Sequence, residues 1–142
     1  MEKLTKEARE IMEERFGKDN VISLATVEDN VPYVRSVNAW YEDKAFYVVT
    51  SGLSNKMKHI EKNPTVAIAG DWFTAHGKGV NLGAFGRQEN AELAGKLRKI
   101  FAEWIDNGHT DLSDENTCIL CIKLTEGVLF SHGTRYEIDF TD

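Results

Sequence analysis

The chain has 142 residues, of which 42% are hydrophobic and 28% charged, and its formal net charge is −6 at pH 7. This composition predicts one folded domain over residues 1–142 and excludes global disorder. The net negative charge argues against nucleic acid or anionic lipid as a partner, and without a signal-peptide pattern or a membrane-length apolar run we expect a cytoplasmic protein.

The spacing of apolar residues predicts the secondary structure in chain order. Helices are predicted after Thr5, an expected N-cap, over residues 54–61, and along an apolar stripe from Leu93 to Ile105. Strands are predicted over residues 21–27, 31–40, 45–50, 65–72, 80–87, 118–124 and 128–131, with a loop over 74–79. Strands joined mostly by hairpin-length turns indicate a mainly β fold with flanking helices (α+β), built as a small antiparallel barrel.

A metal site is not expected from the cysteines or histidines. Cys118 and Cys121 form a Cys-x-x-Cys pattern, but they lie in a predicted strand, where residues three apart face opposite sides. The histidines are scattered, without the spacing that places two on one helical face. Both cysteines are therefore predicted to be buried thiols.

Two segments together predict a phosphate-binding cradle. The first carries Arg35 in the returning strand of a hairpin, and the second runs through a Ser-Gly turn into a helix that begins at Ser54. Lys56 in the first helical turn opposes the positive end of the helix dipole, which makes sense if a phosphate is bound there. The alternative is that Arg35 and Lys56 are solvated surface charges and that Ser54 is an ordinary N-cap.

The order of these segments resembles the flavin-binding split barrels related to pyridoxamine 5'-phosphate oxidase, particularly the small general-stress-protein-like members. The resemblance extends from residues 21–27 through 63–68 to the closing strands. It implies a six-stranded antiparallel split β-barrel that forms a homodimer and holds FMN between the subunits. It assigns Arg35 and Lys56 to the FMN phosphate, Ser54 and Asn55 to further polar contacts, and Ser36, Val37, Asn38, Val49 and Thr50 to the isoalloxazine ring and ribityl chain.

The resemblance also directs attention to the partner chain's side of the flavin. The region around Lys78 and Gly79 falls where the family supplies contacts from the partner subunit. Trp72 has two open interpretations: contact with the partner's flavin, and packing in an aromatic core or interface. Trp104 belongs to the apolar stripe of the long helix and is expected to pack there.

Departures from the family limit the expected activity. The tail reads Arg135-Tyr136-Glu137, without the histidine of the Arg-x-His motif that the vitamin B6 oxidases carry. Vitamin B6 oxidation is therefore disfavoured, and we expect a flavin-dependent oxidoreductase that moves a hydride from NAD(P)H to a small-molecule acceptor, with no catalytic side chain assigned. The alternatives are a non-catalytic flavin-binding stress-response module, a haem-binding split barrel and a deazaflavin-dependent reductase.

Overall fold

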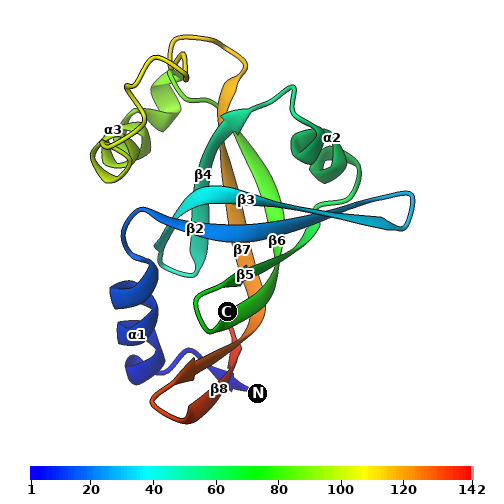
Figure 1. Cartoon of the computed structure of the whole chain (residues 1–142), viewed down its shortest axis with the longest axis vertical. Helices are drawn as coiled ribbons and strands as arrows, with labels where there is room; N and C mark the ends of the chain where they lie inside the picture. The colour runs from blue at the N-terminus through cyan, green and yellow to red at the C-terminus, as the bar shows by residue number, and fades with distance from the viewer. Residues whose placement is uncertain (142) are drawn as a thin grey trace.

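The computed structural model describes residues 1–141. Their β-strands form one barrel, and the helices lie around it (Figure 1). The strands are β1 (Glu2–Lys3), β2 (Asn20–Glu28), β3 (Val31–Glu42), β4 (Ala45–Ser51), β5 (Thr65–Gly70), β6 (Phe73–Ala84), β7 (Thr117–Ser131) and β8 (Thr134–Asp139). The helices are α1 (Lys6–Phe16), α2 (Asn55–Lys62) and α3 (Ala91–Ile100), with a short 3-10 helix at Gln88–Asn90.

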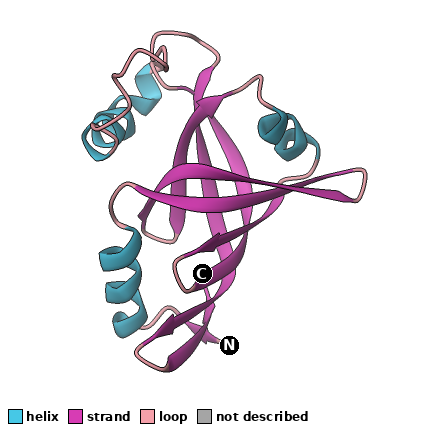
Figure 2. Cartoon of the chain, viewed as in Figure 1, coloured by secondary structure: helices cyan, strands magenta, loops and turns pink. Residues whose placement is uncertain are grey.

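Six strands close into an antiparallel barrel in the order β7-β4-β3-β2-β5-β6, because β6 also pairs with β7. Strand β8 extends the sheet beyond β7 as a hairpin, and the short β1 pairs with β8 in parallel. Figure 2 shows these strands crossing at the centre with the helices outside them. The six-stranded antiparallel split barrel expected from the sequence is confirmed.

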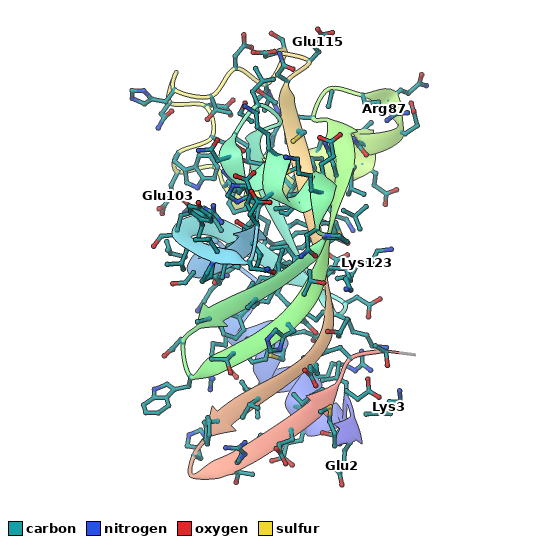
Figure 3. The ribbon with its side chains drawn as sticks, turned by 90° about the vertical axis from the view of Figure 1, so that its right-hand side faces the viewer. Glu2, Lys3, Arg87, Glu103, Glu115 and Lys123 are labelled. Atoms are coloured by element: carbon teal, nitrogen blue, oxygen red, sulfur yellow. The ribbon has the colours of Figure 1, made fainter. Side chains whose placement is uncertain are left out.

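Two apolar clusters stabilise this arrangement. The barrel core includes Phe16 of α1, whose ring lies 5.6 Å from that of Phe46 and 5.5 Å from that of Phe73. The second cluster lies under α3 and includes Trp40 and Leu97. Charged side chains such as Lys123 of β7 project from the outside of the barrel (Figure 3).

The first helix begins where the sequence predicts. Thr5 is the N-cap of α1, and its hydroxyl accepts a hydrogen bond from the Ala8 amide at 3.2 Å. Gly17 is the C-cap and donates its amide to the Glu13 carbonyl. The Thr5 hydroxyl thus satisfies one of the amide groups that a helix start leaves without an intrahelical partner.

The predicted loop at 74–79 is wrong, because these residues belong to β6. The glycines that suggested a loop are required by close packing. A Cβ on Gly77 would lie 2.6 Å from the Lys123 carbonyl oxygen, and one on Gly79 would lie 2.9 Å from the Ile60 side chain. Glycine here permits strand β7 and helix α2 to approach β6, which places α2 close to the barrel.

Other boundaries also differ from the sequence prediction. Strand β5 ends at Gly70 rather than at residue 72, and β6 ends at Ala84 rather than at residue 87. The segments 118–124 and 128–131 form one continuous strand, β7, and the long helix ends at Ile100. Phe101 and Ile105 nevertheless remain fully buried beyond the helix end. The apolar stripe therefore predicted burial correctly, although the backbone after Ile100 forms turns.

The cysteines occupy the positions expected of structural thiols. Cys118 and Cys121 both lie in β7, are buried and are not joined in a disulfide. Burial raises the pKa of each thiol. This environment favours the unreactive protonated form.

Candidate anion-binding site

Arg35 lies on the inner face of β3, opposite Leu24 of β2. Its Nη1 donates to the Thr26 hydroxyl at 2.7 Å, to the Leu24 carbonyl at 3.2 Å and to the Tyr33 carbonyl at 3.4 Å. Partial burial lowers the pKa of Arg35, which stays far above neutrality in any protein environment. The hairpin thus holds one end of the guanidinium group in a fixed position.

The other edge of the Arg35 guanidinium has no protein acceptor. Within residues 1–141, Nη1 alone is engaged, and Nε and Nη2 make no hydrogen bond or ion pair. These nitrogens carry three of the five guanidinium hydrogens and form the planar edge that pairs with two oxygens of a carboxylate or phosphate. The hydrogen bonds of Nη1 to the barrel therefore leave the Nε and Nη2 edge of Arg35 available to an anion.

The connection between β4 and α2 prepares a second set of donors. The Gly52 amide donates to the Asn116 carbonyl at 2.6 Å, which ties the turn to the segment before β7. The Ser54 hydroxyl donates to the Ser51 carbonyl at 2.7 Å and makes no side-chain cap on the helix. The expected position of Ser54 at the helix start is confirmed, but the first-turn amides of α2 lack a side-chain acceptor.

Lys56 lies in that first turn, half-buried, and its ammonium group has no acceptor among the residues that the structure describes. Desolvation is the main cause that lowers its pKa, and the positive charge of Arg35 lowers it further. The neighbouring Cys118 thiol acts in the opposite direction. A half-buried cation beside a second cation, with no carboxylate against either, is the environment in which an anion would be stabilised most.

Replacement of Lys56 by methionine should stabilise the ligand-free protein at pH 7. The lysine pKa is lower in the folded chain than its ordinary 10.5, so its charge opposes folding most strongly below the folded pKa. That penalty is relieved as the pH rises from the folded pKa towards 10.5, where the unfolded chain still binds the proton. Urea unfolding of both proteins from pH 7 to pH 10 should show the wild type approaching the Lys56→Met variant. A difference in unfolding free energy between the two proteins that does not change with pH would contradict the lowered pKa of Lys56.

The remaining cradle residues of β3 alternate between its two faces, as a strand requires. Arg35 and Val37 face inward, and Val37 packs against the barrel core. Ser36 and Asn38 face the outside of the β2–β3 hairpin, since they pair with Ser23 and Val21. The predicted set is therefore divided by the strand, and a flavin contacting all of it would have to reach around the edge of β3.

Asn38 has a structural partner as well. Its Nδ2 donates to Asp19 Oδ1 at 3.1 Å, and the Trp104 indole donates to Asp19 Oδ2 at 3.0 Å. One carboxylate thus joins β3 to the segment that follows α3. Trp104 packs beside the second apolar cluster, as expected from the sequence.

The predicted residues on β4 and α2 also take separate positions. Thr50 pairs across the sheet with Cys118, on the same side as Lys56. Val49 points the other way and packs against the cluster under α3. Asn55 is exposed at the first residue of α2. Arg35, Thr50 and Lys56 thus come from three different elements to one side of the barrel.

The residues expected to reach a partner's flavin lie in β6 and in the turn that precedes it. Trp72 is 71% exposed in the turn between these strands, where its φ of 52° is unusual for a bulky residue. Lys78 donates to the Thr65 hydroxyl at 2.7 Å. Gly79 lines a hollow of about 540 Å³ between α2 and β6, together with Gly52 and Ile60. Their roles towards a second chain stay predictions.

Among residues 1–141, no group of three or more histidine, cysteine, aspartate and glutamate side chains is arranged to hold a metal ion. No helix in the same part of the chain is long and apolar enough to cross a membrane. Arg35 and Lys56 are two cations without a carboxylate partner among the described residues, and the β2–β3 hairpin and α2, which carry them, lie on the same side of the barrel (Figure 1).

Comparison with known families agrees with this architecture. Residues 4–129 match the family described as Pyridoxamine 5'-phosphate oxidase. The chain belongs to this family. The sequence has no match among curated protein sequences.

Solved structures share the oxidase-family fold over most of the chain. General Stress Protein 26 from Bacillus anthracis is 17% identical with a TM-score of 0.69, and the alignment covers 92% of this chain and 98% of that one. A FAD-binding protein from Mesorhizobium loti is 16% identical (TM-score 0.62; 75% and 82% covered). A heme binding protein from Mycobacterium smegmatis is 13% identical (TM-score 0.66; 87% and 54% covered). At these identities the similarity establishes the fold alone.

Two residues that hold the site together were not predicted from the sequence. Thr26 accepts the shortest hydrogen bond of Arg35, and His59 of α2 bonds to Thr26 in turn. Thr26 has no distinguishing sequence context inside β2. His59 had one signal, since it occupies the buried side of a short helix together with Met57 and Ile60.

Proposed function

We propose that this protein binds FMN, with the flavin phosphate between Arg35 and Lys56, and that it is a flavin-dependent oxidoreductase. In this proposal the protein is a homodimer with FMN at the subunit interface, NAD(P)H is the electron donor, and a small molecule other than a B6 vitamer is the acceptor. FMN supplies the hydride-transfer chemistry when it is bound. The protein supplies binding, orientation and the exclusion of water.

One observation supports FMN above all others: a half-buried ammonium and the free edge of a guanidinium lie together at an uncapped helix start. A phosphate monoester carries nearly two negative charges and three acceptor oxygens. It would pair with the Arg35 edge, neutralise Lys56 and accept hydrogen bonds from the first-turn amides of α2. The fit is chemical as well as electrostatic, because the Arg35 edge and the Lys56 ammonium lack an acceptor among the described residues and the start of α2 has no side-chain cap.

A role in vitamin B6 oxidation receives no support from the tail of the chain. Arg135 lies in β8, where its guanidinium stacks over the Phe130 ring at 5.5 Å and pairs with Glu137 at 3.3 Å. Figure 1 places β8 at the opposite end of the barrel from α2. The arginine that a substrate motif would supply is thus engaged away from the proposed phosphate site.

A haem ligand is the competing proposal, because one similar structure is a heme binding protein. His59 is buried, but its Nδ1 is bonded to Thr26 and its Nε2 lies 3.8 Å from Glu28. His76 is on the exposed side of β6, 3.4 Å from Glu126. His59 therefore has no free ring nitrogen and His76 is exposed beside a carboxylate, which favours flavin over haem.

The deciding experiment is the absorption spectrum and mass of the small molecule that co-purifies with the protein, followed by titration of the ligand-free protein with FMN, FAD, riboflavin and haem. We expect a yellow protein with the two absorption bands of oxidised flavin and the highest affinity for FMN. A colourless protein that binds no added flavin would overturn the proposal, and a Soret band would favour haem. Turnover with NADH or NADPH and simple acceptors separates an enzyme from a non-catalytic flavin-binding module.

A further inference from the structure

Beneath the proposed phosphate site lies a buried polar chain that the sequence did not reveal. His59 is 5% exposed, and its ring lies 4.9 Å from the Tyr33 ring. Thr26 lies in β2 of the β2–β3 hairpin, which also carries Tyr33, and it is fully buried. Polar groups at such depth are costly unless they are hydrogen-bonded, so their partners define how the chain is organised.

The hydrogen bonds of Thr26 fix the direction of the chain. Its hydroxyl oxygen accepts from Arg35 Nη1 at 2.7 Å and lies 2.8 Å from His59 Nδ1. A threonine hydroxyl has one hydrogen to donate. Within residues 1–141 the His59 ring nitrogen is the acceptor within reach of that hydrogen. The arrangement that satisfies all three groups therefore has Thr26 donating to Nδ1.

This direction determines the tautomer of His59. A ring whose Nδ1 accepts a hydrogen bond carries its proton on Nε2 when it is neutral. The Nε2 atom faces Glu28, with 3.8 Å to Oε2, and a carboxylate there favours a proton on that nitrogen. Glu28, His59, Thr26 and Arg35 thus form one ordered series, in which each group orients the next.

We propose that His59 is a positioning residue that gives the site its selectivity for a phosphorylated flavin, an inference that rests on the proposed FMN site. Through Thr26, His59 holds the Nη1 end of Arg35 against the barrel. The guanidinium plane is then fixed, and its Nε and Nη2 edge is kept for phosphate. The effect should fall on phosphate recognition, because the hydrogen bonds of the series reach the cradle through Arg35.

Two substitutions of similar size at His59 separate this role from simple packing. Asparagine keeps an acceptor near the position of Nδ1, whereas leucine removes it, and both lose the ring contact with Tyr33. We expect His59→Leu to reduce the preference for FMN over riboflavin by about tenfold or more, since a hydrogen bond in a charged network is lost. His59→Asn should keep most of the preference, and riboflavin affinity should be similar in both variants. The exposed His76 provides a control, because His76→Leu should change neither affinity.

Thr26→Val is the second variant, used where His59→Leu unfolds. It removes the hydroxyl that Arg35 and His59 share, and it should reduce the FMN preference as His59→Leu does. The ¹⁵N chemical shifts of the His59 ring in ligand-free protein give an independent measurement and should show the proton on Nε2. Equal loss of preference in the leucine and asparagine variants, unchanged preference in Thr26→Val, or a proton on Nδ1 would each overturn the inference. A wild-type protein with no preference for FMN over riboflavin would instead refute the phosphate site itself.

Discussion

FMN should bind about 10- to 150-fold more weakly to Lys56→Ala and to Arg35→Ala than to the wild-type protein, whereas riboflavin should bind all three proteins about equally. Each substitution deletes a charged donor to the phosphate, and such a hydrogen bond contributes about 1.5–3 kcal/mol. At 25 °C this range corresponds to the stated loss in affinity. Titration calorimetry with both ligands measures it directly, and riboflavin isolates the phosphate because the two molecules otherwise have the same ring and ribityl chain.

Lys58 and Arg35→Lys provide matched controls. Lys58 is exposed in the same helix, so Lys58→Ala removes an equal charge without touching the cradle and should leave FMN affinity nearly unchanged. Arg35→Lys keeps a positive charge but loses the planar edge, and its FMN affinity should fall between the wild type and Arg35→Ala. Similar losses for FMN and riboflavin in the cradle variants would show that these residues do not recognise phosphate.

The protein should be a homodimer that retains FMN only while it is associated. The outer face of the β2–β3 hairpin exposes apolar side chains, with Val21 61% and Val34 71% exposed. The register places Val34 opposite Ala25, and Ala25 opposite Ala67 of β5, so small apolar residues continue across three strands. Exposed apolar residues that continue across neighbouring strands are typical of an obligate interface, which usually buries more than about 2,000 Å².

Val34→Glu should therefore yield a monomer that loses FMN, since it places a charge at the centre of that face. Light scattering over a dilution series measures the association, and the flavin absorbance of the same samples measures retention. FMN at about 100 times its dissociation constant should stabilise the wild-type dimer by about 2.7 kcal/mol and oppose dissociation on dilution.

Phe130→Glu is the control for surface charge, because Phe130 is 39% exposed in the β7–β8 hairpin, away from α2. It should remain dimeric and yellow. If Phe130→Glu dissociates and Val34→Glu does not, the interface lies at the other end of the barrel. A Val34→Glu monomer that keeps a full complement of FMN would exclude an interfacial site.

The barrel was predictable because its strands and hairpins have strong local signals. The β2–β3 turn is one example, since Asp29 and Asn30 both adopt positive φ, as a tight hairpin requires and as their side chains permit. The interior of β6 was not predictable, because Gly77 and Gly79 are needed for contacts with Lys123 and Ile60, which are distant in sequence. Local patterns identify glycine as a break but do not reveal what approaches it.

The same distinction applies to the candidate site. Arg35 and Lys56 were predictable because a cation at a helix start conflicts with the helix dipole unless an anion is present. Thr26 and His59 were not, because their importance comes from one hydrogen bond between β2 and α2, made by residues 33 positions apart. Strand alternation alone places Ser36 and Asn38 on the opposite face of β3 from Arg35. Only the closed barrel shows which of the two faces is the inner one.

The alternation of β3 also constrains how the chain length can vary. Arg35 faces the barrel and Ser36 the outside, so one extra residue within the strand before Arg35 would exchange the two faces. The guanidinium would then no longer reach Thr26, and the outer face would gain a charge where Ser36 now lies. The Asp29–Asn30 turn is not bound by this constraint, because residues added there extend the loop and leave the pairing from Val31 onward intact. Insertions should therefore be tolerated at the tip of this hairpin and excluded from the strand beside it.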